Sequence, residues 1–121
     1  EVGGPLETVV DIPETFNYLL GLRVKKVKAK TLRLAQGDRN KYLFIHGEKE
    51  GVNIAVVWRK VDDNWDEGDF KKDKEFIIKE LKDWMPQKIY VNAQSVLTTD
   101  FEGHPVEIHY IEPEFKTLMF S

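Results

Sequence analysis

The chain has 121 residues, and its 18 Lys and Arg against 21 Asp and Glu give a formal net charge of -3 at pH 7. Hydrophobic residues (41%) and aromatic residues (12%) are numerous enough to form a buried core, which excludes an intrinsically disordered chain. Cysteine is absent, so disulfides, thiolate metal sites, iron–sulfur clusters and a cysteine nucleophile are excluded as well. No apolar run reaches the roughly 18 residues that span a bilayer, and we expect a cytoplasmic protein without a membrane partner.

The net charge hides an uneven distribution along the chain. Residues 1–60 hold 11 basic and 7 acidic side chains, whereas residues 61–121 hold 7 basic and 14 acidic ones. A domain with oppositely charged halves is suited to meet nucleic acid, or an oppositely charged protein, with one face. The first residue is Glu1 and not Met, so we expect the chain to be processed or to be a piece of a longer protein.

The chain begins with a linker pattern and a short helix. Residues 1–10 contain Gly3-Gly4-Pro5 and have no helical period, which is typical of a linker or remnant. Asp11 is a good helix cap, and Gly21 is a common residue just after a helix end. The sequence therefore predicts a helix over residues 13–20.

Strand patterns follow the first helix. Residues 22–34 are rich in β-branched side chains with partial alternation, which predicts a strand, or two short ones, with a bulge near Lys25-Lys26. A turn is expected over residues 36–40. Residues 41–46 and 52–58 are apolar and aromatic, so they predict a β-hairpin whose loop is the five residues between them.

One main helix is expected in the second half of the chain. An acidic loop over residues 61–69 precedes a helical period over residues 70–85. Asp69 is the expected cap of this helix, and Pro86 is its expected end. Because strand patterns flank the helix, we expect a right-handed crossover between two strands of one sheet.

The remaining segments predict two strands and a short helical turn. Residues 88–92 and 106–111 have strand patterns, and a turn is expected over residues 101–105. Residues 93–100 fit either a loop or a partial helix, and a helical turn is expected after Pro113. Together the elements predict an α+β (mixed α/β) fold, with a mainly antiparallel mixed sheet of about five strands, one main helix (about 70–85) and a short N-terminal helix.

The strongest candidate binding feature is a basic stretch in the first predicted strand. Phosphate contact needs cations spaced along one surface, and alternate residues of a strand share a face. Lys26, Lys28 and Lys30 are therefore expected to form a short basic ridge. The alternative is a solvated edge strand whose lysines prevent edge-to-edge aggregation. The candidate nucleic-acid-binding residues are Arg23, Lys25, Lys26, Lys28, Lys30 and Arg33.

Two further features are candidate sites. Trp65 lies in the polar acidic loop and is a candidate anchor for a protein partner, because Trp is enriched at interface hot spots. His104, Glu107 and His109 lie close together in sequence and could bind zinc only if the fold made them converge. Without a fixed ligand spacing we assign no metal site. We also assign no catalytic residue, because neither Ser95 nor Ser121 lies in a Gly-x-Ser-x-Gly motif.

Seven short sequence strings occur in a characteristic order along the chain. The strings are Pro13–Leu22, Tyr42-Leu43-Phe44, residues 47–51, Val57-Trp58-Arg59, Phe70-x-x-Asp73-Lys74-Glu75-Phe76, Lys88–Asn92 and Ile111–Phe120. In this order they resemble the C-terminal region of the modification subunit of type III restriction–modification systems, a site-specific adenine DNA methyltransferase. The resemblance covers residues 12–120, and the order of the strings carries it.

The resemblance implies a role without catalysis in this chain. The family transfers a methyl group from S-adenosylmethionine to adenine, with an Asp-Pro-Pro-Tyr-type catalytic motif and a Phe-x-Gly-x-Gly cofactor motif. Neither motif occurs here, so no cofactor is expected in this fragment. Residues 11–121 are expected to form a single C-terminal accessory domain that assists DNA contact, or interaction with another methyltransferase or restriction subunit. The alternatives are an independent small metal-dependent hydrolase or nuclease, and a purely structural dimerisation domain.

Overall fold

The computed structural model describes residues 11–34 and 39–120. The predicted linker over residues 1–10 and most of the predicted turn over residues 36–40 lie outside these ranges. The elements in chain order are α2 (Ile12–Leu20), β1 (Arg23–Arg33), β2 (Arg39–Lys49), β3 (Val52–Arg59), α3 (Glu67–Leu81), a 3-10 turn (Lys82–Trp84), β4 (Lys88–Val91), β5 (Asp100–Phe101), β6 (His104–Pro105), β7 (Glu107–Tyr110) and α4 (Ile111–Met119).

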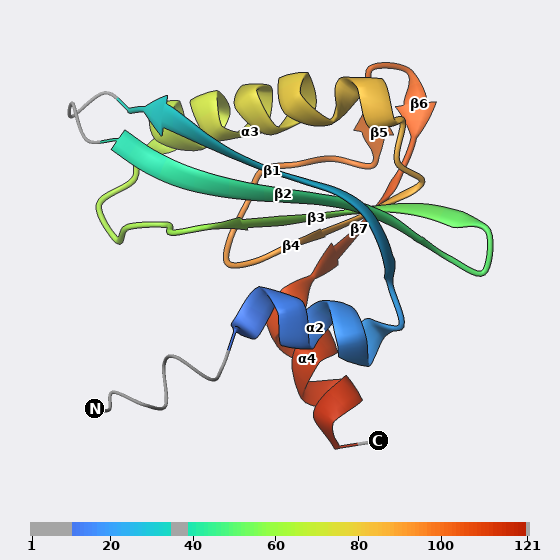
Figure 1. Ribbon diagram of the computed structural model, residues 1–121. Coiled ribbons are helices and arrows are strands. Elements are labelled where there is room, and N and C mark those ends of the chain that lie inside the picture. Colours follow the sequence, from blue (N-terminus) through green and yellow to red (C-terminus); the bar gives the residue numbers. More distant parts are fainter. Residues whose placement is uncertain (1–10, 35–38, 121) are drawn as a thin grey trace, which may run out of the picture.

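The core of the fold is a five-stranded sheet with the order β1-β2-β3-β4-β7. The first three strands are antiparallel, and β4 runs parallel to both β3 and β7. Figure 1 shows α3 and the short β5–β6 hairpin on one face of this sheet, and α2 and α4 on the other. The predicted α+β fold with a mixed sheet of about five strands is confirmed.

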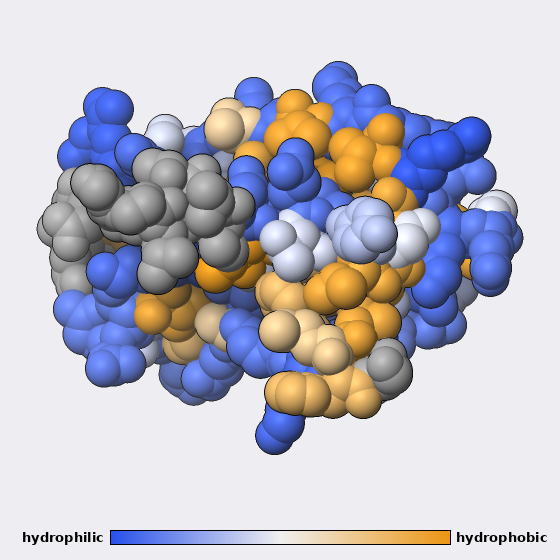
Figure 2. Space-filling model, turned by 60° about the horizontal axis from the view of Figure 1, so that its bottom comes forward, coloured by the Kyte–Doolittle hydropathy of each residue, from blue (hydrophilic) through white to orange (hydrophobic). Residues whose placement is uncertain are grey.

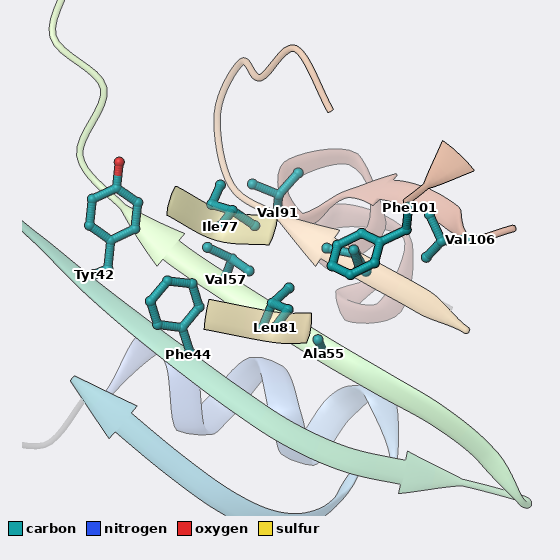
Figure 3. Close-up of a cluster of buried hydrophobic side chains, with 10 residues drawn as sticks. Tyr42, Phe44, Ala55, Val57, Ile77, Leu81, Val91, Phe101 and Val106 are labelled. Atoms are coloured by element: carbon teal, nitrogen blue, oxygen red, sulfur yellow. The ribbon is translucent and has the colours of Figure 1, made fainter. Parts of the chain in front are cut away.

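Each face of the sheet has its own hydrophobic cluster. Under α3, side chains from β2, β3 and β4 pack against Ile77 and Leu81, and Phe101 and Val106 of the hairpin region close one end (Figure 3). On the other face of the sheet, Phe16 of α2 and Ile111 of α4 pack against side chains of the same strands. Since β3 lies between the two clusters, it is buried over residues 54–57.

The N-terminal helix is built as its sequence predicts. The Asp11 side chain accepts a hydrogen bond from the Glu14 backbone N–H at 3.1 Å, which satisfies one of the free donors of the first turn. Gly21 ends α2 with a φ of 80°, a left-handed conformation that glycine adopts without a steric penalty. Pro13 is accommodated because it lies in the first turn.

The prediction of a five-residue hairpin loop is wrong. β2 continues to Lys49 and β3 begins at Val52, so only Glu50 and Gly51 form the turn. Both residues have positive φ, 51° and 81°, which matches the twist of the flanking strands. Gly47, expected in the loop, lies within β2 opposite Ile54.

The main helix starts earlier and ends earlier than its sequence period suggests. Asp66, not Asp69, is the N-cap: its side chain accepts the Asp69 N–H, while the Asp69 carboxylate accepts the Asp66 N–H. This reciprocal capping box starts α3 at Glu67. After Leu81 the chain tightens into the 3-10 turn and then reaches Met85 with a φ of 50°, directly before Pro86.

The C-terminal segment forms more helix than expected. The predicted turn over residues 101–105 is the β5–β6 hairpin, and residues 93–99 form neither helix nor strand. β7 covers Glu107–Tyr110, and α4 then extends over Ile111–Met119, where only a short turn after Pro113 was expected. Proline is tolerated in the first turn of a helix, so Pro113 does not stop α4 from starting before it.

Several large apolar side chains of α2, of α4 and of the residue after α4 are exposed to solvent. Figure 2 shows apolar atoms gathered on the face that carries these helices, among hydrophilic ones. The exposed fractions are 50% for Ile12, 83% for Tyr18, 59% for Met119 and 80% for Phe120. Among the described residues, no helix is both long and apolar enough to cross a membrane.

Candidate nucleic-acid interface

All six predicted basic residues lie on β1, which is an edge strand of the sheet. The register with β2 shifts between Val24 and Lys26, so the predicted bulge near Lys25-Lys26 is confirmed. Beyond the bulge, Lys26, Lys28 and Lys30 stand opposite His46, Phe44 and Tyr42, and therefore share the face that carries α3. The predicted common face of these three lysines is thus present.

The side chain of Lys28, the middle residue of this ridge, forms contacts within the protein. Its Nζ lies 3.1 Å from Glu80 Oε1 and donates a hydrogen bond to the Glu80 backbone oxygen at 2.6 Å. It also lies 4.8 Å from the ring centroid of Trp84. Glu80 is in the last turn of α3, where a cation is favoured by the helix dipole. Lys28 therefore ties the edge strand to the end of the main helix.

Arg23 and Lys25 share one carboxylate at the start of β1. Arg23 Nη2 and Lys25 Nζ lie 3.1 Å and 3.0 Å from Glu48 Oε1. Hydrogen bonds from Lys25 and Arg23, together with their charges, hold the pKa of Glu48 below its ordinary value. These ion pairs are solvent-exposed, so each contributes little to stability and a phosphate could compete for the cations.

Lys26 and Lys30 are the cations that the fold leaves available. Both are exposed, and neither forms an ion pair with another residue in the described ranges. Four residues of a strand separate them by about 13 Å. Arg33 is also exposed, at the end of β1 opposite Arg39. In the ion pairs between described residues, Arg23 and Lys25 bind Glu48 and Lys28 binds Glu80, so the strand carries more cations than carboxylates in these pairs.

A buried polar network lies where β3 and β4 end. Arg59 Nε and Nη2 donate to the two carboxylate oxygens of Asp73 at 3.0 Å and 2.8 Å, and both side chains are fully buried. The Tyr42 hydroxyl donates to Asp73 Oδ1. The Arg59 guanidinium also donates to the backbone oxygens of Asn92 and Gln94. Burial, and then the Asp73 carboxylate, raise the pKa of Tyr42 above its ordinary value.

Residues from the strings that carry the family resemblance lie together in this network and in one aromatic cluster. Tyr42, Arg59, Asp73 and Asn92 come from four different strings. On the other face of the sheet the ring of Phe16 packs against three more aromatic rings, those of Trp58, Tyr90 and Phe115, with centroids 5.5 to 6.0 Å away. These strings therefore supply internal packing and hydrogen bonds of the fold.

A groove of about 480 Å³ opens beside the network, on the face that carries α2. Trp58, Leu43 and Ala29 give it an apolar wall, and Lys41 and Lys60 are its exposed cations. The sequence prediction did not include these lysines. The alternation of Leu43 with Lys41 in β2 could have indicated a shared face, but the pairing of β2 with β3 was needed to bring Lys60 to the same place.

Trp65, the candidate partner anchor, is largely covered by its own chain. Its exposed fraction is 9%, and its ring packs on Phe70 with centroids 5.1 Å apart. The Arg59 guanidinium carbon lies 5.9 Å from the centroid of the Trp65 ring. Trp65 lines an open cavity of about 640 Å³ at the start of α3, but its small exposed fraction leaves little of the indole for a partner to contact.

The histidines do not assemble a metal centre. His109 Nε2 lies 3.0 Å from Glu107 Oε1 on β7, whereas His104 belongs to β6 in the separate hairpin. Among residues 11–34 and 39–120, no three His, Asp or Glu side chains are grouped so that they could hold a metal ion. The convergence that a zinc hydrolase would require of His104, Glu107 and His109 is missing.

The comparisons with known proteins add no family to this description. Neither a family model, nor a curated protein, nor a solved structure matches the chain.

Proposed function

We propose that this chain is a non-catalytic accessory domain of a type III restriction–modification adenine DNA methyltransferase, and that it contacts DNA through β1. The observation that carries the proposal is the excess of cations along one exposed edge strand, with Lys26 and Lys30 free of ion pairs among the described residues. The order of the resembling strings supports the family. In this proposal the parent enzyme binds S-adenosylmethionine elsewhere and acts in the cytoplasm.

Salt-dependent DNA binding tests the role of β1. A fluorescent duplex should bind the 121-residue chain with an affinity that falls as salt rises, because each phosphate contact releases counterions. The double variant K26A/K30A should lower the affinity uniformly across sequences and reduce the salt slope by about 1 for each lysine. Lys116→Ala on α4 is the control, because it removes an exposed lysine from another element. Equal affinity and equal slope for K26A/K30A and the native chain would overturn the DNA role of β1.

Subunit interaction is the second candidate, and the apolar side chains exposed on α2 and α4 favour it. Contiguous exposed apolar groups often mark protein contacts. If two copies pair through this face, light scattering should give the mass of a dimer for the native chain. A variant with Tyr18→Ser and Phe120→Ser should then give the mass of a monomer. A native chain that remains monomeric at high concentration would exclude self-association.

A further inference from the structure

We infer that the groove between α2 and the ends of β2 and β3 binds an unpaired nucleotide of single-stranded DNA. This inference rests on the proposed DNA role and adds to it the form of nucleic acid that is held. A nucleotide needs an aromatic or apolar surface for its base and cations for its phosphate, and proteins that bind single strands combine the two. The groove supplies both kinds of group around an open hollow of about 480 Å³.

The apolar wall is formed by strand neighbours that share one face. Leu43 of β2 stands opposite Trp58 of β3, and both line the groove together with Ala29 of β1 and Pro13 of α2. The Trp58 ring is held edge-on by Phe16 at a centroid distance of 6.0 Å. Trp58 therefore offers a fixed and partly exposed ring, and an unstacked base can pack on such a ring without sequence preference.

The two cations are placed together by the pairing of β2 with β3. Tyr42 stands opposite Arg59, so the adjacent residues Lys41 and Lys60 reach the same end of the hairpin. Like charges brought together across two strands repel each other, and a phosphate between them would remove this repulsion. The described residues that line the groove include no carboxylate. Among the described residues, Lys60 Nζ forms an ion pair with Asp62 at 3.7 Å, at an exposed position.

The neighbouring arginine does not compete for the phosphate. Arg59 borders the groove, but its guanidinium is occupied by Asp73 and by the backbone oxygens of Asn92 and Gln94. Phosphate contact therefore falls to Lys41 and Lys60, whose side chains are exposed. By the strand register, Lys26 and Lys30 stand on the face that carries α3, but Lys30 also lines a neighbouring hollow together with Lys41. Lys26 and Lys60 therefore separate the basic ridge from the groove most clearly.

Nuclear magnetic resonance can follow the Trp58 ring through an aromatic C–H signal, because the ring is partly exposed whereas its Nε1 atom is buried. The signal of Trp58 is assigned by its loss in Trp58→Phe, and the native chain is then titrated with oligothymidylate and with a duplex. We expect the Trp58 ring signal to shift with the single strand and to stay in place with the duplex. An unmoved Trp58 signal at saturating single strand would overturn the inference.

Affinity measurements with matched variants complete the test. K41A/K60A should weaken oligothymidylate binding by on the order of ten-fold and reduce its salt slope by about 0.7 for each lysine. Lys116→Ala is again the control. If K26A/K30A abolishes single-strand binding while K41A/K60A leaves it unchanged, the groove is excluded but DNA contact by β1 stands. If K41A/K60A alone weakens the single strand, the groove is supported even where duplex binding by β1 fails.

Discussion

Arg59 and Asp73 form a fully buried, bidentate ion pair that joins the end of β3 to the middle of α3. Two charges can be buried only if their hydrogen-bonding groups are satisfied, and here Tyr42 and the backbone oxygens of Asn92 and Gln94 provide the remaining partners. The Asn92 side chain in turn bonds the N–H and the C=O of Arg59. The network thereby continues the link between β3 and β4 past the end of both strands.

Removal of Asp73 should strongly destabilise the chain. In Asp73→Ala the guanidinium of Arg59 would remain buried without its counter-charge, and loss of one partner of such a pair costs about 3–5 kcal/mol. Urea denaturation would measure the change in the free energy of unfolding. The matched control is Asp62→Ala, which breaks an exposed ion pair with Lys60 and should change stability by less than about 1 kcal/mol. Equal effects of the two substitutions would contradict the structural importance of the network.

Tyr42 should make the chain sensitive to alkaline pH. Its pKa is raised in the folded state, so the folded chain keeps a proton that the unfolded chain loses. The stability that comes from this difference is complete below the ordinary tyrosine pKa of about 10 and is lost as pH rises beyond it. Tyr42→Phe should lower stability at pH 7 and flatten this alkaline loss. Stability curves from pH 8 to pH 11 that stay parallel for the two proteins would count against this account.

Lys28 and Lys26 should behave differently although they lie two residues apart on one strand face. Lys28→Ala removes an ion pair and a charge-assisted hydrogen bond to Glu80, and we expect a loss of about 1–2 kcal/mol in thermal or urea unfolding. Lys26→Ala removes an exposed side chain and should change stability by no more than about 0.5 kcal/mol. A loss for Lys26→Ala as large as that for Lys28→Ala would show that the structural assignment is wrong.

Gly47 should tolerate no side chain. A Cβ at this position would lie 2.6 Å from the Arg23 backbone oxygen and 2.8 Å from Leu22 Cγ. Gly47→Ala would force β1 and β2 apart, and we expect a loss of about 2–3 kcal/mol, which urea denaturation would measure. In the control Gly68→Ala, the new Cβ would meet only the Asp66 side chain at 3.3 Å, within a helix that favours alanine over glycine. Its effect should stay within about 1 kcal/mol, and a larger loss there than at Gly47 would refute the steric argument.

Local chemistry explains which elements could be predicted. The cap at Asp11, the end at Gly21 and the bulge near Lys25-Lys26 depend on residues close in sequence, and the structure confirms all three. The start of α3 was misplaced because both Asp66 and Asp69 can cap a helix. Only the backbone geometry shows that they do so reciprocally from Asp66.

The sequence by itself determined the α+β class, the mixed sheet and the presence of a basic strand, because hydrophobic periodicity and charge order are local properties. Only the tertiary structure decided which of these cations are available. The packing of α3 on the sheet places Glu80 beside Lys28, and the two side chains form an ion pair. The pairing of β2 with β3 places Lys41 close to Lys60. Contacts between residues far apart in sequence depend on strand order and register, and no local pattern encodes these directly.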